Sequence, residues 1–138
     1  MEPTTKRRRV AGCIPIGRPT DTSAPLKILF VTSNSHPQMF ILPKGGIEEN
    51  ETAQDAALRE TWEEAGVCGE ITRFVMEMKD GKSITQWFEM SVGEQKSEWP
   101  EMEARRRKWM TLDEALESSW VKEKFKLVLL QYRKDASR

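Results

Sequence analysis

The pattern of apolar and polar residues along the chain predicts several short strands around one central helix. Strands are expected wherever apolar, β-branched and aromatic residues concentrate between turn-forming residues. These segments are residues 10–16, 26–32, 39–42, 71–78, 83–92 and 107–110. Asp80-Gly81, between the fourth and fifth segments, is typical of a hairpin turn. Residues 43–46 (Pro-Lys-Gly-Gly) are expected to interrupt regular structure.

A helix is expected at residues 52–65, between the two groups of strands. Thr52, with Asp55 three residues later, fits a capping box, and Gly66 is a natural helix terminator. One side of this helix carries small residues, which would let its backbone lie close to a sheet. They are Ala53, Ala56, Ala57 and Thr61.

Two more helices are expected near the C-terminus. Thr111 and Glu114 form a second capping box at the start of a short helix, and residues 121–133 form an amphipathic helix. Because strands occur before, between and after only a few helices, the pattern predicts an α/β fold in which a mixed sheet has helices on both faces. We expect residues 1–7 to be a flexible basic N-terminus and residues 8–138 to be a single domain.

The composition is typical of a soluble globular protein. Hydrophobic residues make up 38% of the 138 residues and charged residues 32%. No apolar run approaches the ~20 residues of a membrane span, and the basic N-terminus is not followed by the apolar segment of a secretory signal. Two cysteines give no disulfide framework, and one histidine excludes a multi-histidine metal centre. We therefore expect a cytoplasmic monomer, with the nucleus as a second location, in which Cys13 and Cys68 are free buried thiols.

The charges balance overall but are segregated along the chain. Lys plus Arg and Asp plus Glu each number 22, so the net charge is zero. This balance excludes a uniformly basic nucleic-acid-binding surface, although local patches can still carry strong fields. Basic runs occupy residues 6–9 and 105–108, and an acidic stretch spans residues 48–64. The first basic run has two other interpretations, a nuclear-import signal or a solvated tail, and the second could be a charged strand edge.

The acidic stretch places three carboxylates on one face of the central helix. Glu60, Glu63 and Glu64 lie at positions i, i+3 and i+4, so their side chains point the same way. Like charges at this spacing destabilise a helix by roughly 0.2–0.5 kcal/mol per pair. A hard divalent cation with oxygen ligands would offset that repulsion. The simpler interpretation is a solvated acidic face, which is how most such clusters are used.

The residues around these carboxylates favour a functional site. Gly45-Gly46 would let the backbone approach a ligand closely, and Arg59 could orient a carboxylate or support the loop through a bidentate hydrogen bond. Together the segment matches the pattern G-x5-E-x7-R-E-U-x-E-E-x-G-U, with U apolar, and so resembles the Nudix box. The matching residues are Gly45, Glu51, Arg59, Glu60, Glu63, Glu64, Gly66 and Val67. Thr61 is the one departure, and a chance match is on the order of one in a million or rarer.

This resemblance implies the Nudix α/β/α sandwich and Mg²⁺-dependent cleavage of a phosphoanhydride, with Mn²⁺ as an alternative ion. Such a reaction needs attack by water, charge neutralisation on phosphate oxygens and a base. On this hypothesis Glu60 and Glu64 hold the metal, helped by the Lys44 carbonyl. Glu63 takes the proton of the water, and Arg59 supports the catalytic carboxylates.

Further similarity points to the diphosphoinositol polyphosphate and diadenosine polyphosphate hydrolases, the fungal members in particular. It rests on Arg-Arg-Val-Ala-Gly-Cys-Ile, Val-Thr-Ser-Asn, Leu-Pro-Lys-Gly-Gly and Arg-Arg-Arg-Lys-Trp, and covers residues 8–130, loosely between 78 and 103. The resemblance implies substrates dense in phosphate: inositol pyrophosphates, diadenosine penta- and hexaphosphate, and polyphosphate. By position, the substrate contacts would be Arg8, Arg9, Thr32, Ser33, Asn34, Lys44, Gly45, Gly46 and Arg105, with Lys82 and Lys122 from looser parts of the similarity.

Two alternative functions stay open. One is a nucleotide-directed Nudix pyrophosphatase that acts on dinucleoside polyphosphates or an RNA cap, for which an aromatic platform would be expected to stack a base. The other is a Nudix fold that binds phosphates or a partner without catalysis. His36, beside Pro37, is expected to be a turn residue, and Trp62 is expected to pack rather than stack a base.

Overall fold

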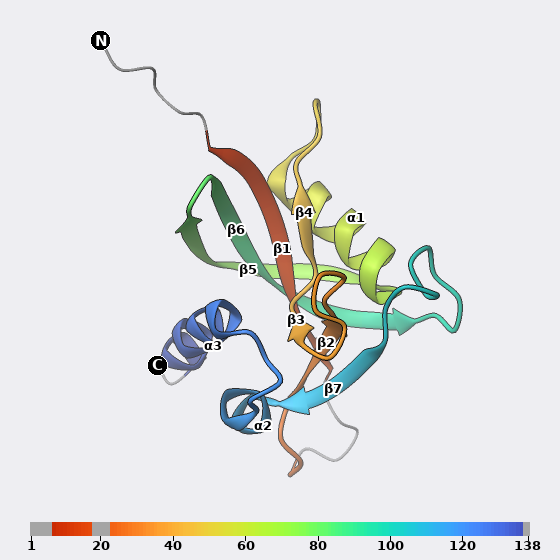
Figure 1. The fold of residues 1–138 in the computed structure, drawn as a ribbon, viewed down its shortest axis with the longest axis vertical. Coiled ribbons are helices and arrows are strands. Elements are labelled where there is room, and N and C mark those ends of the chain that lie inside the picture. The colour runs from red at the N-terminus through yellow and green to blue at the C-terminus, as the bar shows by residue number, and fades with distance from the viewer. Residues whose placement is uncertain (1–6, 18–22, 137–138) are drawn as a thin grey trace.

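One mixed sheet with helices on both faces organises the part of the chain that the structure, a computed structural model, describes: residues 7–17 and 23–136 (Figure 1). The strands are β1 (Arg8–Gly17), β2 (Lys27–Thr32), β3 (Phe40–Ile41), β4 (Lys44–Gly46), β5 (Val67–Asp80), β6 (Ser83–Gln95) and β7 (Arg107–Thr111). The helices are α1 (Ala53–Ala65), α2 (Leu112–Glu117) and α3 (Glu123–Ala136). The predicted α/β sandwich with a mixed sheet is confirmed. Residues 1–6 of the N-terminus that we expect to be flexible lie outside the described residues.

The strand order is β3-β2-β1-β6-β5, with β4 pairing β1 and β7 pairing β2. β1 runs parallel to β6 and antiparallel to β2 and β4. Its first half pairs with β4 and its last residues pair with β2. The central strand therefore places the glycine-rich β4 in the sheet, directly beside α1.

Alternating side chains on the central strands build two separate cores. Cys13 of β1 packs with the α1 residues Ala56 and Ala57, which are fully buried. The next residue, Ile14, points to the opposite face and packs with Phe125 of α3. Figure 1 shows α1 on one side of the sheet and α2 and α3 on the other. The small residues of α1 allow the close approach that was predicted for them, and Cys13 donates to the Ala57 carbonyl at 3.5 Å.

The prediction that residues 43–46 interrupt regular structure is wrong for its last three residues. Lys44–Gly46 forms β4, in which Gly46 pairs with Val10 and Lys44 pairs with Gly12. Glycine weakens an isolated strand, but here the first half of β1 offers unpaired backbone groups, and pairing satisfies them. The backbone beside the acidic helix is therefore fixed by sheet hydrogen bonds.

The long hairpin of β5 and β6 extends beyond its predicted ends. Gly81 has φ of 56°, so the Asp80-Gly81 turn is confirmed. β5 begins at Val67, immediately after α1, because pairing with β6 continues to the end of the helix. Cys68 lies on the outward side of this extension and is exposed, which corrects the expectation that both thiols are buried.

The predicted caps define the helix ends. Thr52 accepts a hydrogen bond from the Asp55 backbone N–H at 3.0 Å, and Gly66 ends α1 in the left-handed conformation with φ of 68°. Both bonds of the second capping box, between Thr111 and Glu114, are present. None of the helices in the described part of the chain has both the length and the apolar character needed to cross a membrane.

Candidate active site

Arg59 joins the loop before α1 to the helix itself. Its Nε donates to Glu51 Oε2 at 2.7 Å and its Nη2 donates to Glu51 Oε1 at 3.0 Å. Nη2 also donates to the Gly46 carbonyl at 2.9 Å. These hydrogen bonds raise the pKa of Arg59, and the same bonds, with one from the Glu48 backbone N–H, lower the pKa of Glu51 to about 2. Both groups are therefore charged, and the loop is held to the helix by charge-assisted bonds.

The same guanidinium orients two carboxylates on the face of α1. Arg59 Nη1 donates to Glu60 Oε1 at 2.7 Å and to Glu63 Oε1 at 3.3 Å. The Glu60 carboxylate lies directly over the Cα of Gly45, so that a Cβ at this position would overlap it. The close approach that glycine permits at β4 is thus made by a side chain of the site itself, where a ligand had been expected.

Glu64 is the most buried carboxylate of the group. Its side chain is 6% exposed, accepts a hydrogen bond from the Lys44 backbone N–H at 3.2 Å and lies 3.9 Å from Arg105 Nη2. Burial raises the pKa of Glu64, Arg105 opposes this shift, and the adjacent Glu60 carboxylate raises the pKa further. Two neighbouring carboxylates in this position create a demand for positive charge.

The Glu60 and Glu64 carboxylates, which are close enough to share a hydrogen bond, fit an open magnesium site. Among the described residues, no three His, Cys, Asp or Glu side chains form a group that could hold a metal ion. Mg²⁺ is ordinarily bound by one or two carboxylates, with water and substrate phosphate completing its coordination. The donor set present is therefore suited to an ion that substrate helps to bind.

Residues 96–107 cap the C-terminal end of α1. The last carbonyls of a helix have no partner within the helix. Here four successive carbonyls accept bonds from one segment: Glu63 from the Glu101 N–H (3.0 Å), Glu64 from Trp99 Nε1 (3.0 Å), Ala65 from Arg107 Nη1 (3.2 Å) and Gly66 from the Lys96 N–H (2.9 Å). The Arg107 guanidinium also stacks 3.8 Å from the centre of the Trp99 ring. The helix end that carries the carboxylates is thus fixed to this segment.

Arg105 belongs to the same segment and faces the carboxylates. Its side chain is 9% exposed, with Nη1 donating to the Thr32 carbonyl at 2.8 Å and Nε donating to Glu101 at 2.8 Å. The Thr32 hydroxyl accepts from the Arg106 backbone N–H at 2.9 Å. The carbonyl and the hydroxyl oxygen of Thr32 therefore both help to position residues 105 and 106. The side chains of Arg105 and Arg107 are thus not those of a solvated strand edge, whereas Arg106 and Lys108 are exposed.

A cavity of about 320 Å³ opens beside Glu64. Two residues that line it, Lys44 and Arg105, also contact Glu64, Lys44 through its backbone N–H and Arg105 through Nη2. The other described residues that line it are Ser33, Asn34, Ser35, Ile41, Lys122, Lys124 and Phe125. Five of the predicted substrate contacts therefore converge here: Ser33, Asn34, Lys44, Arg105 and Lys122.

Positive charge dominates this cavity. Lys122 donates to Ser35 Oγ at 3.3 Å, and Lys124 lies in the first turn of α3, where the helix dipole adds partial positive charge. Burial lowers the pKa of Lys44, the nearby Lys124 lowers it further, and Glu64 raises it. Four cationic side chains, Lys44, Arg105, Lys122 and Lys124, thus face one cavity that has no acidic residue in its described lining.

Other predicted contacts lie outside this cavity. Arg8 and Arg9 begin β1 and are exposed, and the Arg8 backbone N–H donates to the Lys82 carbonyl at 2.6 Å. The Arg8 guanidinium lies close to the Cα of Gly46, so a Cβ there would be 2.8 Å from Nη2. Arg8 thus lies at the opposite end of β4, beside Gly46, whose carbonyl accepts a hydrogen bond from Arg59. A second hollow, of about 500 Å³, is also lined by Arg105, together with Thr32 and Met102.

Comparison with known proteins identifies the family of this arrangement. A model of the NUDIX domain matches residues 6–131. The chain belongs to the Nudix family. Nudix hydrolase 21, chloroplastic, of Arabidopsis thaliana is 36% identical over 129 residues, which cover 87% of this chain and 65% of the relative. Diphosphoinositol polyphosphate phosphohydrolase 2 of Mus musculus is 34% identical over 94 residues, covering 65% of this chain and 52% of that protein.

Solved Nudix structures share the fold. An Ap4A hydrolase of Caenorhabditis elegans, solved as a binary complex, superposes with a TM-score of 0.71 at 17% identity and covers 93% of this chain and 98% of its own. The chain spans about two thirds of the length of the Arabidopsis relative and about half that of the mouse relative. Nudix enzymes generally use divalent metals, in agreement with the open carboxylate pair. The subfamily and the cytoplasmic location stay predictions.

The Nudix box alone did not reveal every residue of the site. Lys124 was missed because it lies in the amphipathic helix α3, where a lysine is ordinarily solvated. The sequence feature that could have indicated it is a lysine in the first turn of a helix, where acidic residues are favoured. Trp99 and Arg107 were not predicted to belong to the site, since the spacing of residues along the chain does not show that they meet the end of α1.

Proposed function

We propose that this Nudix chain hydrolyses phosphoanhydride bonds in densely phosphorylated small molecules, with Mg²⁺ as its metal. Diphosphoinositol polyphosphates are the first choice of substrate, followed by diadenosine penta- and hexaphosphate and polyphosphate. The observation that carries this proposal is the cavity lined by four cationic residues, two of which, Lys44 and Arg105, also contact Glu64. The names of the mouse and nematode relatives, which refer to diphosphoinositol polyphosphate and Ap4A, support the same substrate class.

The cavity suits an anion with several phosphates. Each phosphate needs its own cation or N–H donor once it leaves water, and the described lining supplies cations from β4, the loop before β7 and the start of α3. Lys44 and Arg105 lie at the boundary between this cavity and Glu64. A substrate phosphate held by these two residues would therefore adjoin the carboxylates.

The box residues divide the chemistry among them. Glu60 and Glu64 would hold Mg²⁺, which when bound neutralises charge on the phosphate oxygens. Glu63 would take the proton of the attacking water, since its side chain is 35% exposed against 14% for Glu60 and 6% for Glu64. Arg59 donates to both Glu60 and Glu63 and so fixes their separation.

The cavity favours a phosphorylated ring over a nucleobase. A base is ordinarily bound by stacking on an aromatic side chain. Phe125 is the aromatic residue in the described lining, but it is 1% exposed and packs edge-on against Trp87, with 5.9 Å between ring centres. It therefore has no free face for a base. This observation ranks diphosphoinositol polyphosphates above substrates whose recognition requires the base, including capped RNA.

The test is a side-by-side hydrolysis assay on the purified protein with and without Mg²⁺. The substrates are a diphosphoinositol polyphosphate, diadenosine hexaphosphate, capped RNA and a nucleoside triphosphate. Glu63→Gln is the catalytic variant, and Glu49→Gln, on the exposed loop before α1, is the matched control. We expect preferred Mg²⁺-dependent turnover of the diphosphoinositol polyphosphate, lost in Glu63→Gln and retained in Glu49→Gln.

Other outcomes separate the parts of the proposal. A preference for capped RNA or the nucleoside triphosphate would leave Nudix hydrolysis in place but contradict the substrate. Near-normal turnover by Glu63→Gln would show that another group is the base. Tight binding of phosphate-rich ligands without turnover of any substrate would identify a binding module.

A further inference from the structure

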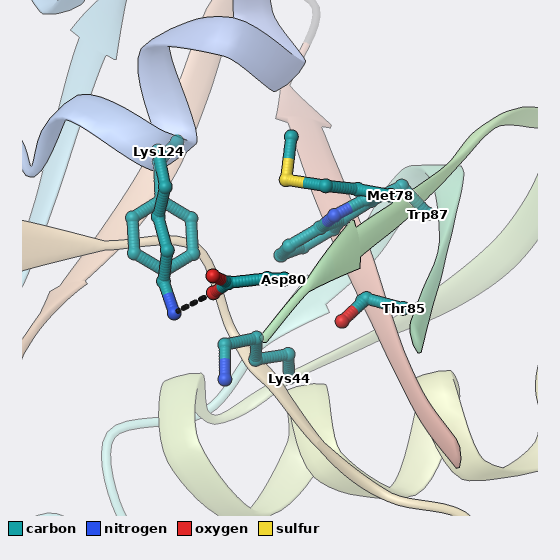
Figure 2. A pocket seen from close by; sticks show the side chains of 7 residues that line it. Lys44, Met78, Asp80, Thr85, Trp87 and Lys124 are labelled. Atoms are coloured by element: carbon teal, nitrogen blue, oxygen red, sulfur yellow. Dashed lines mark hydrogen bonds and ion pairs between the residues drawn. The ribbon is translucent and has the colours of Figure 1, made fainter. Parts of the chain in front are cut away.

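An ion pair bridges two elements at the edge of the cationic cavity. Lys124 of α3 donates to Asp80 Oδ2 at 3.1 Å, and Asp80 lies at the tip of the β5–β6 hairpin. Figure 2 shows the two side chains meeting above Lys44 in that view, with Thr85 and Trp87 beside them. Because 44 residues separate the partners, the pair forms only when α3 and the hairpin are both in place.

Asp80 carries a negative charge among cavity residues whose charges are otherwise positive. A small cavity of about 10 Å³ lies between Lys44, Asp80 and Lys124, and Lys44 and Lys124 also line the larger cavity. Among the described residues that line the two cavities, Asp80 is the one acidic side chain. The small cavity is about the size of one water molecule. A phosphate is too large for this small cavity as it stands.

The location of Lys124 argues that it serves a ligand. It lies in the first turn of α3, where the helix dipole disfavours a cation. Lys122 immediately precedes the helix and adds a second positive charge. Asp80 offsets part of this unfavourable charge, but the pair is exposed, with 44% of Lys124 and 50% of Asp80 accessible, and exposed pairs stabilise a fold little.

We propose that Asp80 is a specificity-determining residue that holds Lys124 until a doubly charged terminal phosphate displaces its carboxylate. The proposal rests on the function proposed above. A phosphate monoester carries close to two negative charges near neutral pH, so it competes well with a carboxylate for Lys124. The internal phosphates of a diadenosine polyphosphate carry one negative charge each, which is the same charge as that of a carboxylate. They therefore have no advantage in charge over Asp80. Asp80 therefore favours diphosphoinositol polyphosphates over diadenosine polyphosphates.

The experiment compares wild type, Asp80→Asn, Lys124→Gln and the double variant with both substrates. Asp80→Asn frees Lys124, so we expect KM for diadenosine hexaphosphate to fall by about two- to fivefold, with a smaller change for the diphosphoinositol polyphosphate. In the Lys124→Gln background, Asp80→Asn should change neither KM. The matched control is Glu94→Gln, which removes the carboxylate of an exposed pair with Lys96 at the other end of the same hairpin and should leave both values unchanged.

A binding measurement tests the exchange independently of turnover. Calorimetry without divalent metal gives Kd for inositol hexakisphosphate, whose phosphates are all monoesters, and for diadenosine hexaphosphate. Asp80→Asn should tighten binding of the second ligand more than binding of the first. Melting temperatures should match that of wild type, because the pair is exposed.

The outcomes distinguish this inference from the proposed function. If Asp80→Asn leaves the ratios of KM and of Kd between the two ligands unchanged, the role of Asp80 is overturned. It is also overturned if the substitution strengthens binding of the ligand richer in terminal phosphates more, because simple repulsion by the Asp80 carboxylate predicts that result. An equal gain in the Lys124→Gln background would overturn the exchange. If wild type hydrolyses neither substrate, the proposed function fails, and the Kd ratio still decides the role of Asp80.

Discussion

Arg59 binds Glu51 through two parallel hydrogen bonds, Nε to Oε2 at 2.7 Å and Nη2 to Oε1 at 3.0 Å. The two residues are eight positions apart, so the pair joins the loop to the helix. The remaining nitrogen, Nη1, donates to Glu60 and Glu63. One planar group thus ties the loop, β4 and two carboxylates together. A lysine ammonium cannot reproduce this geometry, because it is a point charge without a fixed fork.

Arg59→Lys should therefore impair both stability and activity. We expect the free energy of unfolding to fall by about 1.5–3 kcal/mol, since hydrogen bonds to charged groups are lost. kcat should fall by roughly 100-fold, because Glu60 and Glu63 lose the group that fixes their positions. Urea unfolding and steady-state kinetics measure the two effects. Arg73→Lys, at a half-exposed arginine of β5 that pairs with Asp135 at 3.5 Å, is the control and should retain activity.

The low pKa of Glu51, about 2, predicts how stability depends on pH. A carboxyl whose pKa is lower in the folded state than in the unfolded state stabilises the fold above its unfolded pKa, about 4.3. This contribution is lost as pH falls from there toward 2. The melting temperature of Glu51→Gln should therefore lie below that of wild type at pH 7, and the gap should narrow below about pH 4. Glu49→Gln is the control in the same loop. A gap that stays constant from pH 7 to pH 3 would contradict this account.

Local patterns were sufficient to predict most of the fold. Thr52 and Gly66 mark the ends of α1 because a cap depends on groups close in sequence. The order of strands and helices along the chain was enough to predict a mixed sheet with helices on both faces. β4 was not predicted, since the pairing of Lys44–Gly46 depends on the free edge of β1, which lies more than thirty residues away in the chain.

Residue spacing alone predicted the site only where its residues form one segment, and the contacts that line the cavity were predicted from the family resemblance. Arg59 and the box carboxylates lie within one loop and helix, so their spacing indicates a shared face. The cap on α1 depends on Trp99 and Arg107, and the bridge over Lys44 depends on Asp80 and Lys124. Each of these contacts joins elements that are distant in sequence. The sequence alone does not show which of these distant side chains are in contact.

Gly45→Ala should separate catalytic geometry from folding. A Cβ at Gly45 would overlap the Glu60 carboxylate and so displace it from Glu64. We expect roughly a 100-fold loss of kcat and a higher Mg²⁺ concentration for half-maximal activity, with the sheet intact. Gly93→Ala is the control, because a Cβ there would be 3.7 Å from the nearest atom, an ordinary contact. Equal activities of the two variants would show that Glu60 does not need this position.

Trp99→Phe should reveal how the cap on α1 supports catalysis. The indole N–H donates to the Glu64 carbonyl at 3.0 Å, while the ring stacks with Arg107 and packs on Gly66. Phenylalanine keeps an aromatic ring but leaves this carbonyl without its donor. The free energy of unfolding should fall by about 1 kcal/mol, the net contribution of one hydrogen bond.

The kinetic effect of this substitution should exceed its effect on folding. Glu64 and Arg105 are held by the two sides of the cap, so a small shift between helix and segment should lower kcat by about tenfold while KM changes little. Trp109→Phe removes a comparable indole hydrogen bond, to Gln95 at 3.0 Å on an exposed edge, and should leave kcat near that of wild type. If both variants lose stability and kcat in parallel, Trp99 acts through folding alone. If only Trp99→Phe loses kcat, the cap positions the carboxylates for hydrolysis.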